Sequence, residues 1–100
     1  MIRVAVVDDH PLVREGTAAI VDRADDMEIA GVAGSLDELR PMLDGSVDVL
    51  LLDLRLGQES GFDLLREADA PMPSVVVLTS SDYPQYAAAA LRLGAAGFVV

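Results

Sequence analysis

Short apolar runs alternate along the chain with segments in which apolar and charged residues recur at helical spacing. The first run, residues 2–7, is β-branched and interrupted only by Arg3, which is typical of a strand buried on both faces. Further runs predict strands at residues 27–34, 47–53, 74–80 and 97–100. The segments between them predict helices from Pro11, from Ser35, over residues 62–69 and from Asp82 to Gly94. This alternation predicts an α/β fold, a doubly wound parallel sheet with helices on both faces.

Local signals refine three of these segments. Ser35 and Glu38 have the spacing of a capping box, whereas Pro41 predicts that the same helix is short or kinked. Gly57 and Gly61 are interpreted as the ends of a loop. The first helix is predicted to be amphipathic, with most of its charged residues facing water. Its apolar side consists of Leu12, Gly16, Ala19, Ile20 and Ala24.

Composition narrows the classes of protein that are possible. The 100 residues, 52% of them hydrophobic, suffice for one domain, and no apolar run approaches the roughly 20 residues that span a bilayer. Charge near the N-terminus argues against a signal peptide, so a cytoplasmic protein without a membrane association is expected. The absence of cysteine excludes disulfides and thiolate metal sites. A net charge of −10, with seven arginines and no lysine, argues against direct binding of nucleic acid.

Acidic and hydroxyl side chains stand at the predicted ends of three strands. Asp8 and Asp9 follow the first strand, Asp53 ends the third, and Thr79 and Ser80 end the fourth. In a parallel α/β sheet these ends meet at one edge, where ligands bind. Clustered carboxylates need a cation, and oxygen ligands suit Mg²⁺. A carboxylate beside Mg²⁺ is also a possible nucleophile toward a phosphoryl group, so the set suggests phosphoryl chemistry.

These motifs resemble those of a known family. The blocks "VVDDHPLVREG", "LLDLRL", "SGFDLL", "VVVLTS" and "LRLGAAGFVV" have the order and spacing of the receiver domain of two-component response regulators, and most resemble the NarL/FixJ-type subfamily. The resemblance covers nearly all of residues 1–100 and implies a flavodoxin-like (CheY-like) five-stranded sheet with strand order 2-1-3-4-5. Flavodoxin and a chemotaxis receiver protein share this order.

The resemblance also implies a role for each site residue. Asp53 matches the phosphoacceptor, Asp9 a direct Mg²⁺ ligand, Asp8 a ligand that acts largely through water, and the backbone carbonyl of Arg55 completes the metal site. The switch positions are Thr79, whose hydroxyl turns toward the phosphoryl group, Ser80 beside it, and the aromatic Phe98. The implied function is not enzymatic: a sensor histidine kinase phosphorylates Asp53, and the domain switches an output. In this subfamily that output is usually a DNA-binding helix-turn-helix domain, which is not in this chain.

The chain departs from the family pattern at two places. Gly57 stands where the family usually has proline, which is expected to loosen the loop without removing a ligand. The family's lysine and last helix would follow Val100, so residues 1–100 are expected to form an incomplete receiver domain. Without that helix, apolar surface is expected to be exposed and self-association to follow.

Other interpretations are weighed against this one. A haloacid-dehalogenase-type phosphatase needs a second aspartate where Arg55 stands, and a cobalamin-binding domain needs glycine where Val13 stands. A receiver-like module that docks partners without phosphorylation remains an alternative. His10, a lone histidine before Pro11, is interpreted as a loop residue more readily than as a metal ligand.

Overall fold

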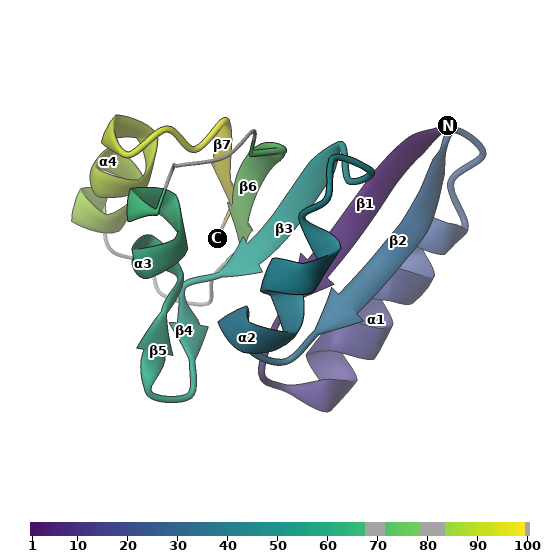
Figure 1. Ribbon diagram of the computed structural model, residues 1–100, viewed down its shortest axis with the longest axis horizontal. Coiled ribbons are helices and arrows are strands. Elements are labelled where there is room, and N and C mark those ends of the chain that lie inside the picture. Colours follow the sequence, from purple (N-terminus) through teal and green to yellow (C-terminus); the bar gives the residue numbers. More distant parts are fainter. Residues whose placement is uncertain (68–71, 79–83, 100) are drawn as a thin grey trace.

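A parallel sheet of five strands forms the centre of the structure, a computed structural model that describes residues 1–67, 72–78 and 84–99 (Figure 1). Its strands are β1 (Ile2–Val7), β2 (Met27–Ala33), β3 (Val49–Asp53), β6 (Ser74–Leu78) and β7 (Gly97–Val99). They lie in the order β2-β1-β3-β6-β7, and all neighbours are parallel. Counted over the strands of this sheet, that is 2-1-3-4-5. The predicted flavodoxin-like order is confirmed.

Helices cover both faces of this sheet. They are α1 (Pro11–Asp22), α2 (Leu36–Leu39), the 3₁₀ turn η1 (Arg40–Met42), α3 (Gly61–Arg66) and α4 (Pro84–Arg92). Figure 1 shows α2 in front of the sheet and α1 behind it. Ser35 is confirmed as the helix cap, because its Oγ accepts a hydrogen bond from the N–H of Glu38 at 3.2 Å. The return bond of the predicted capping box is displaced by one residue, since the Glu38 carboxylate accepts from the N–H of Gly34 at 2.9 Å. Pro41 lies in the 3₁₀ turn, so this helix is short as predicted.

The main hydrophobic core lies between the sheet and the helices α2, α3 and α4. Alternate strand residues point to one face, and the six that face this core are at most 3% exposed: Ala5, Val7, Leu50, Leu52, Val75 and Val77. They pack with Leu36, Leu39, Leu64, Leu65 and Ala90 of the helices. A fully buried leucine or valine stabilises the fold by about 1.5–3 kcal/mol. The ends of β1 and β3 are therefore firmly anchored.

Helix α1 packs on the opposite face, and not through the side predicted for it. Its buried residue is Val21, whereas Leu12 is 85% and Ile20 68% exposed. The prediction of the apolar side was therefore wrong. The helix instead approaches the sheet through Thr17, Ala18 and Val21, which lie on one face at helical spacing. Small side chains suit a close approach to a sheet, and spacing alone does not reveal them as the buried ones.

The segment between Gly57 and Gly61, expected to be part of a loop, belongs to a short antiparallel hairpin. Its strands are β4 (Arg55–Leu56) and β5 (Glu59–Ser60). Gly57 has φ +63°, and no non-glycine residue in the described part has a positive φ. This places the left-handed residue first in the turn, as in a type II′ hairpin. Glu59 Oε1 accepts a hydrogen bond from the N–H of Leu36 at 3.3 Å, which ties the hairpin to α2.

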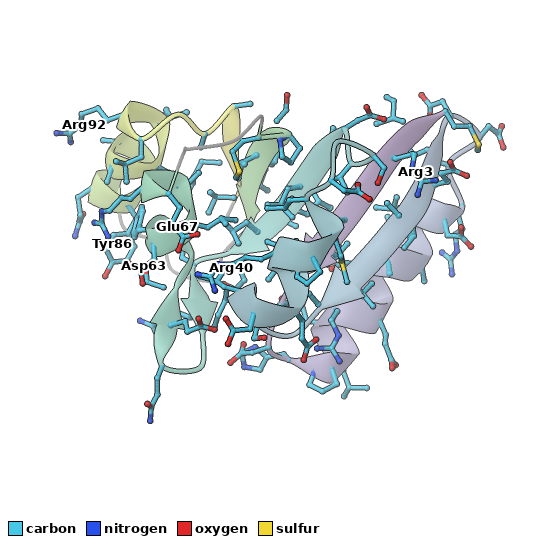
Figure 2. The ribbon with its side chains drawn as sticks, in the orientation of Figure 1. Arg3, Arg40, Asp63, Glu67, Tyr86 and Arg92 are labelled. Carbon is cyan, nitrogen blue, oxygen red and sulfur yellow. The ribbon has the colours of Figure 1, made fainter. Side chains whose placement is uncertain are left out.

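A surface ion pair connects the second and third helical segments. The guanidinium of Arg40 contacts Glu67 Oε1 through Nη2 at 2.7 Å, and Figure 2 shows these two side chains close together. The hydrogen bond from Arg40 lowers the pKa of Glu67. Exposed pairs of this kind contribute at most about 1 kcal/mol. No helix within residues 1–67, 72–78 and 84–99 has the length and apolar character required to cross a membrane.

Candidate metal and phosphoryl site

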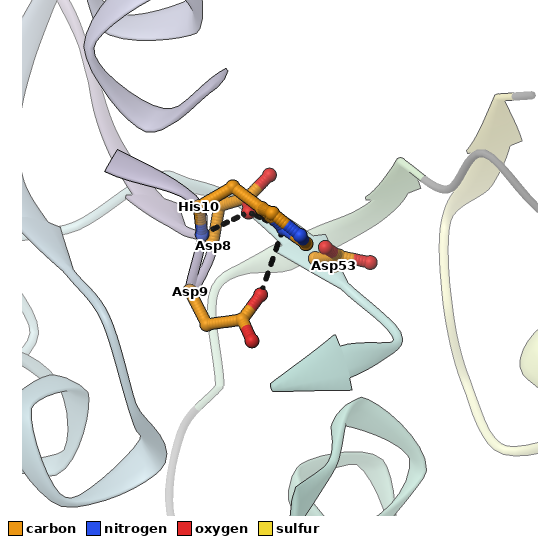
Figure 3. A group of neighbouring side chains, drawn as sticks. All are labelled: Asp8, Asp9, His10 and Asp53. Atoms are coloured by element: carbon orange, nitrogen blue, oxygen red, sulfur yellow. Dashed lines mark hydrogen bonds and ion pairs between the residues drawn. The ribbon is translucent and has the colours of Figure 1, made fainter. Parts of the chain in front are cut away.

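Acidic side chains converge where β1 and β3 end. The two strands are paired in parallel with Val7 opposite Leu52, so the residues that follow them lie side by side. Asp8, Asp9, His10 and Asp53 each offer one ligand atom, and these four atoms all lie within 4.8 Å of one another. Figure 3 shows the imidazole of His10 between the carboxylates. The predicted meeting of the three aspartates is confirmed, and it includes a histidine that was interpreted as a loop residue.

Asp9 is held through one of its oxygens and leaves the other unsatisfied. Oδ2 accepts a hydrogen bond from the backbone N–H of Gly57 at 2.7 Å. Oδ1 is buried and has no hydrogen-bond partner, although Nδ1 of His10 lies 3.0 Å away in a geometry that does not form a hydrogen bond. A buried acceptor without a donor is costly. This oxygen is therefore the one placed to bind a cation.

Asp8 is held by hydrogen bonds to residues that follow it, between β1 and α1 and in the first turn of α1. Its Oδ1 accepts a hydrogen bond from the backbone N–H of His10 at 2.9 Å and lies 3.2 Å from the ring Nδ1. Its backbone carbonyl accepts a hydrogen bond from Nη1 of Arg14 at 3.2 Å. An aspartate that bonds the backbone two residues on forms an Asx-turn. The turn directs the chain from β1 into α1 and orients the Asp8 carboxylate toward the site.

Asp53 carries the clearest electrostatic perturbation in the site. Burial raises the pKa of Asp53 most, the hydrogen bond from the N–H of Arg55 at 3.1 Å opposes this, and the neighbouring Asp8 and Asp9 raise it further. The ionised form is thus disfavoured by desolvation and by like charge. The positive charge of a bound cation would offset both costs. The hydrogen bond to Asp53 places the backbone N–H of Arg55 at the site. The role of the Arg55 carbonyl as a metal ligand stays a prediction.

The residues present fit Mg²⁺. Three carboxylates provide hard oxygen ligands, and the unsatisfied Oδ1 of Asp9 is available without breaking a hydrogen bond. Mg²⁺ is bound through one or two carboxylates together with water and phosphate oxygens. The other carboxylate oxygens then remain for water or for a reacting group.

A groove of about 430 Å³ opens beside the acids on the face that α1 partly covers. Asp8, His10 and Asp53 form its polar end. The remainder is lined by Val6, Val7, Leu51, Leu78 and Val99 of the sheet and by Val13 and Thr17 of α1. Asp8, His10 and Asp53 thus stand at the polar end of an otherwise apolar groove.

Three predicted switch residues are less fully placed. Thr79 and Ser80 lie outside the described residues, directly after β6. Phe98 lies in β7 opposite Val77 and packs, partly buried, against the main core. Two contributors were missed from the sequence, the backbone N–H of Gly57 and the ring of His10. The sequence did contain a signal for the N–H of Gly57, because glycine replaces the family's usual proline there and proline has no N–H to donate.

The fold and site define a class of α/β proteins with an acidic cluster at the carboxyl ends of neighbouring strands. Residues 4–100 match the response regulator receiver domain. The chain is 33% identical over 103 residues to the DNA-binding transcriptional activator DevR/DosR of Mycobacterium tuberculosis, covering 100% of this chain and 48% of the relative. It is 35% identical over 100 residues to the transcriptional regulatory protein UhpA of Salmonella typhimurium, covering 99% and 50%.

Solved structures agree with these relatives. A two-component response regulator of the LuxR family from Aurantimonas sp. SI85-9A1 superposes with a TM-score of 0.86 at 26% identity, covering 96% of this chain and 71% of that chain. The response regulator domain of Thermotoga maritima CheB gives 0.88 at 28% identity, covering 100% and 78%. The chain therefore belongs to the receiver domain family of two-component response regulators. The relatives it matches are mostly transcriptional regulators of the NarL/LuxR type. It spans about half the length of the curated relatives it matches.

Proposed function

We propose that this receiver domain accepts a phosphoryl group on Asp53 from a sensor histidine kinase, in a reaction that requires Mg²⁺. The observation that carries the proposal is the convergence of Asp8, Asp9 and Asp53 in a family member, with one buried oxygen of Asp9 left without a hydrogen bond. When bound, Mg²⁺ supplies positive charge to the carboxylates and to the phosphoryl oxygens. Asp9, Asp53 and the carbonyl of Arg55 would hold the ion directly, and Asp8 would hold it through water.

The protein's own groups carry the transfer. A carboxylate oxygen of Asp53 attacks phosphorus, an O–P bond forms, and the N–P bond to the donor's histidine breaks. The electron pair of that bond stays on the imidazole nitrogen, which takes up a proton. The hydroxyl of Thr79 then donates a hydrogen bond to a phosphoryl oxygen, with Ser80 beside it, and Phe98 changes position. These changes shift the population of conformers toward an active state.

The proposed output is control of transcription. The relatives named as transcriptional regulators are about twice as long as this chain, and a DNA-binding domain outside residues 1–100 would contact DNA. The net charge of −10 supports the assignment of DNA contact to another domain, because residues 1–100 would repel nucleic acid. We further propose that the domain works in the cytoplasm as a signalling module and not as an enzyme.

The test is to incubate the chain with Mg²⁺ and a small-molecule acyl phosphate and to read the intact mass. A single phosphoryl adduct is expected, absent with a chelator and absent in Asp53→Asn. Asp63→Asn, which changes an exposed aspartate of α3, is the matched control and should keep the adduct. No adduct on the folded wild-type chain would contradict the proposal and favour a module that docks partners without phosphorylation.

A further inference from the structure

The ring of His10 lies at the exposed rim of the acidic site, although the metal chemistry that the family resemblance implies uses only oxygen ligands. Nδ1 of His10 is 3.2 Å from Oδ1 of Asp8 and 3.0 Å from Oδ1 of Asp9. His10 is the N-cap residue of α1, and its side chain is 68% exposed, with the ring beside the acids (Figure 3). Its contacts are with the two carboxylates that would hold the ion, so its role has to be considered together with theirs.

These distances match those between neighbouring ligands of one ion. Two ligand atoms that are each about 2.1 Å from an ion and at right angles lie about 3.0 Å apart. Nδ1 of His10 has this separation from each of the two carboxylate oxygens, and it is hydrogen-bonded to that of Asp8. Asp8, Asp9, His10 and Asp53 each offer one ligand atom within 4.8 Å of the others. The oxygen of Asp9 next to Nδ1 is also the buried one that has no hydrogen bond. A single ion placed among these atoms would contact nitrogen as well as oxygen.

A nitrogen ligand changes which ions a site prefers. Carboxylate and water oxygens suit Mg²⁺, whereas imidazole suits Zn²⁺, Ni²⁺ and Cu²⁺, which also bind more tightly to a given set of donors than earlier divalent metals of the first row. Zn²⁺ accepts histidine nitrogen together with carboxylate oxygen. A site with three carboxylates and one imidazole is therefore better suited to these borderline ions than a site of carboxylates alone.

We propose that Nδ1 of His10 is an additional ligand of this site, and that it raises the affinity for borderline divalent transition ions, with Zn²⁺ and Cu²⁺ as probes, relative to the affinity for Mg²⁺. The inference rests on the proposed function only in that it uses the same ion site. Such an ion would compete with Mg²⁺ for Asp9 and Asp53. Binding of a transition ion would then reduce the Mg²⁺-dependent phosphorylation proposed above, which adds a metal-responsive control to the domain.

The chain is well suited to a test, because His10 is its single histidine and it has no cysteine. Zn²⁺ and Mg²⁺ affinities are measured by competition with a chromophoric chelator on the wild type and on His10→Ala. The ratio of Zn²⁺ to Mg²⁺ affinity is expected to fall on the order of tenfold in the variant. An unchanged ratio, or an equal loss of both affinities, would overturn the proposal.

Two further measurements separate ligation from an effect on folding. Bound Cu²⁺ is expected to show spin-echo modulation from an imidazole nitrogen in the wild type and not in His10→Ala; no modulation in the folded wild type overturns the proposal. The double variant His10→Ala/Gln85→His restores one histidine at an exposed position of α4, and a ratio restored in it would also overturn the proposal. The Mg²⁺-dependent adduct on the wild type is read in parallel, since its absence contradicts the proposed function and not the ligand assignment.

Discussion

Gly61 begins α3 at a point where the surrounding backbone leaves no room for a side chain. A Cβ there would lie 2.6 Å from the backbone oxygen of Asp53 and 3.1 Å from Cα of Leu54. Neither atom can move without displacing the end of β3. Gly61→Ala is therefore expected to lower the free energy of unfolding by about 1–3 kcal/mol. Urea denaturation followed by circular dichroism measures this change.

Gly16 is the matched control for this prediction. It lies exposed within α1, and a Cβ there would meet no atom within 4 Å. Gly16→Ala is expected to raise the free energy of unfolding by about 0.5–1 kcal/mol, because glycine loses more backbone entropy in a helix than alanine does. Similar effects of the two substitutions would contradict the close approach of Gly61 to the backbone of Asp53.

The raised pKa of Asp53 predicts how stability depends on pH. Between the ordinary value of 3.8 and the raised value, the folded chain binds more protons than the unfolded chain. Stability therefore falls as pH rises through this window and stays lower above it. Asp53→Asn cannot ionise at this position, so in chelator it is expected to melt at a higher temperature than the wild type at neutral pH.

This difference in melting temperature should shrink as the pH is lowered below 3.8, where Asp53 is protonated in both states. Mg²⁺ should also reduce it, because the ion stabilises the folded wild type. Asp63→Asn is again the control for removal of an exposed aspartate. A variant Asp53→Asn that melts below the wild type at neutral pH in chelator would show that the carboxylate does not carry this cost.

The acidic residues of the site were predictable from the sequence, and the histidine was not. Asp8, Asp9 and Asp53 each end an apolar run, and the parallel order of the strands brings such ends together. The orientation of a side chain within a loop has no comparable periodic signal. His10 contacts the acids because the chain turns through the hydrogen bond between its N–H and Asp8, and that turn is visible only in the structure.

At the scale of elements, the β4–β5 hairpin contacts the acidic cluster through the hydrogen bond from the N–H of Gly57 to Asp9. Gly57→Pro removes the N–H from which Asp9 accepts a hydrogen bond, and proline cannot adopt a φ of +63°. Loss of a hydrogen bond to a metal ligand typically costs on the order of tenfold or more in affinity. We expect that loss for Mg²⁺ in Gly57→Pro, measured by calorimetry.

Gly57→Asn is the matched variant for the hairpin. Asparagine keeps the N–H and tolerates the left-handed conformation, so Mg²⁺ affinity is expected to stay within about twofold of the wild type. If both variants bind Mg²⁺ equally well, the hairpin does not orient Asp9. This role was not predicted from the sequence, where glycine in place of proline was interpreted only as added looseness.

Element types followed from the sequence more reliably than the sides on which elements pack. All five strands of the main sheet and the short helix before Pro41 lie where the patterns predict them. The prediction for α1 was wrong because its apolar residues form two adjacent stripes. Spacing identified the stripe that includes Leu12 and Ile20, whereas packing buries the one that includes Val21. Only the crossing of α1 over β1 and β2 decides between them.

At the scale of the whole molecule, apolar surface on the α1 face predicts self-association. Ile20 and Leu12 are exposed on α1, and Val99 is 51% exposed beside the apolar groove. Burying a side chain such as Ile20 contributes about 1.5–3 kcal/mol, so Ile20→Gln is expected to weaken association by about tenfold or more. Sedimentation velocity over a concentration series measures the association constant of the wild type and of Ile20→Gln.

Salt and a second variant complete the test of association. The net charge of −10 opposes contact between copies, so association should strengthen as ionic strength rises. Leu91→Gln changes an exposed leucine of α4, a helix that packs on the other face, and should have a smaller effect. A chain that stays monomeric at all concentrations and salt levels would contradict the prediction.

The parallel pairing of β1 with β3 also makes the proposed ion site sensitive to the register of the two strands. Val7 lies opposite Leu52, and the acids follow these two residues. A slip of one residue would carry Asp53 about 3.3 Å along β1 and turn its side chain to the other face of the sheet. No ion could then bridge the two strands. Metal affinity thus reports whether the first strand, which leaves the ribosome before its partner, has joined that partner in the correct alignment.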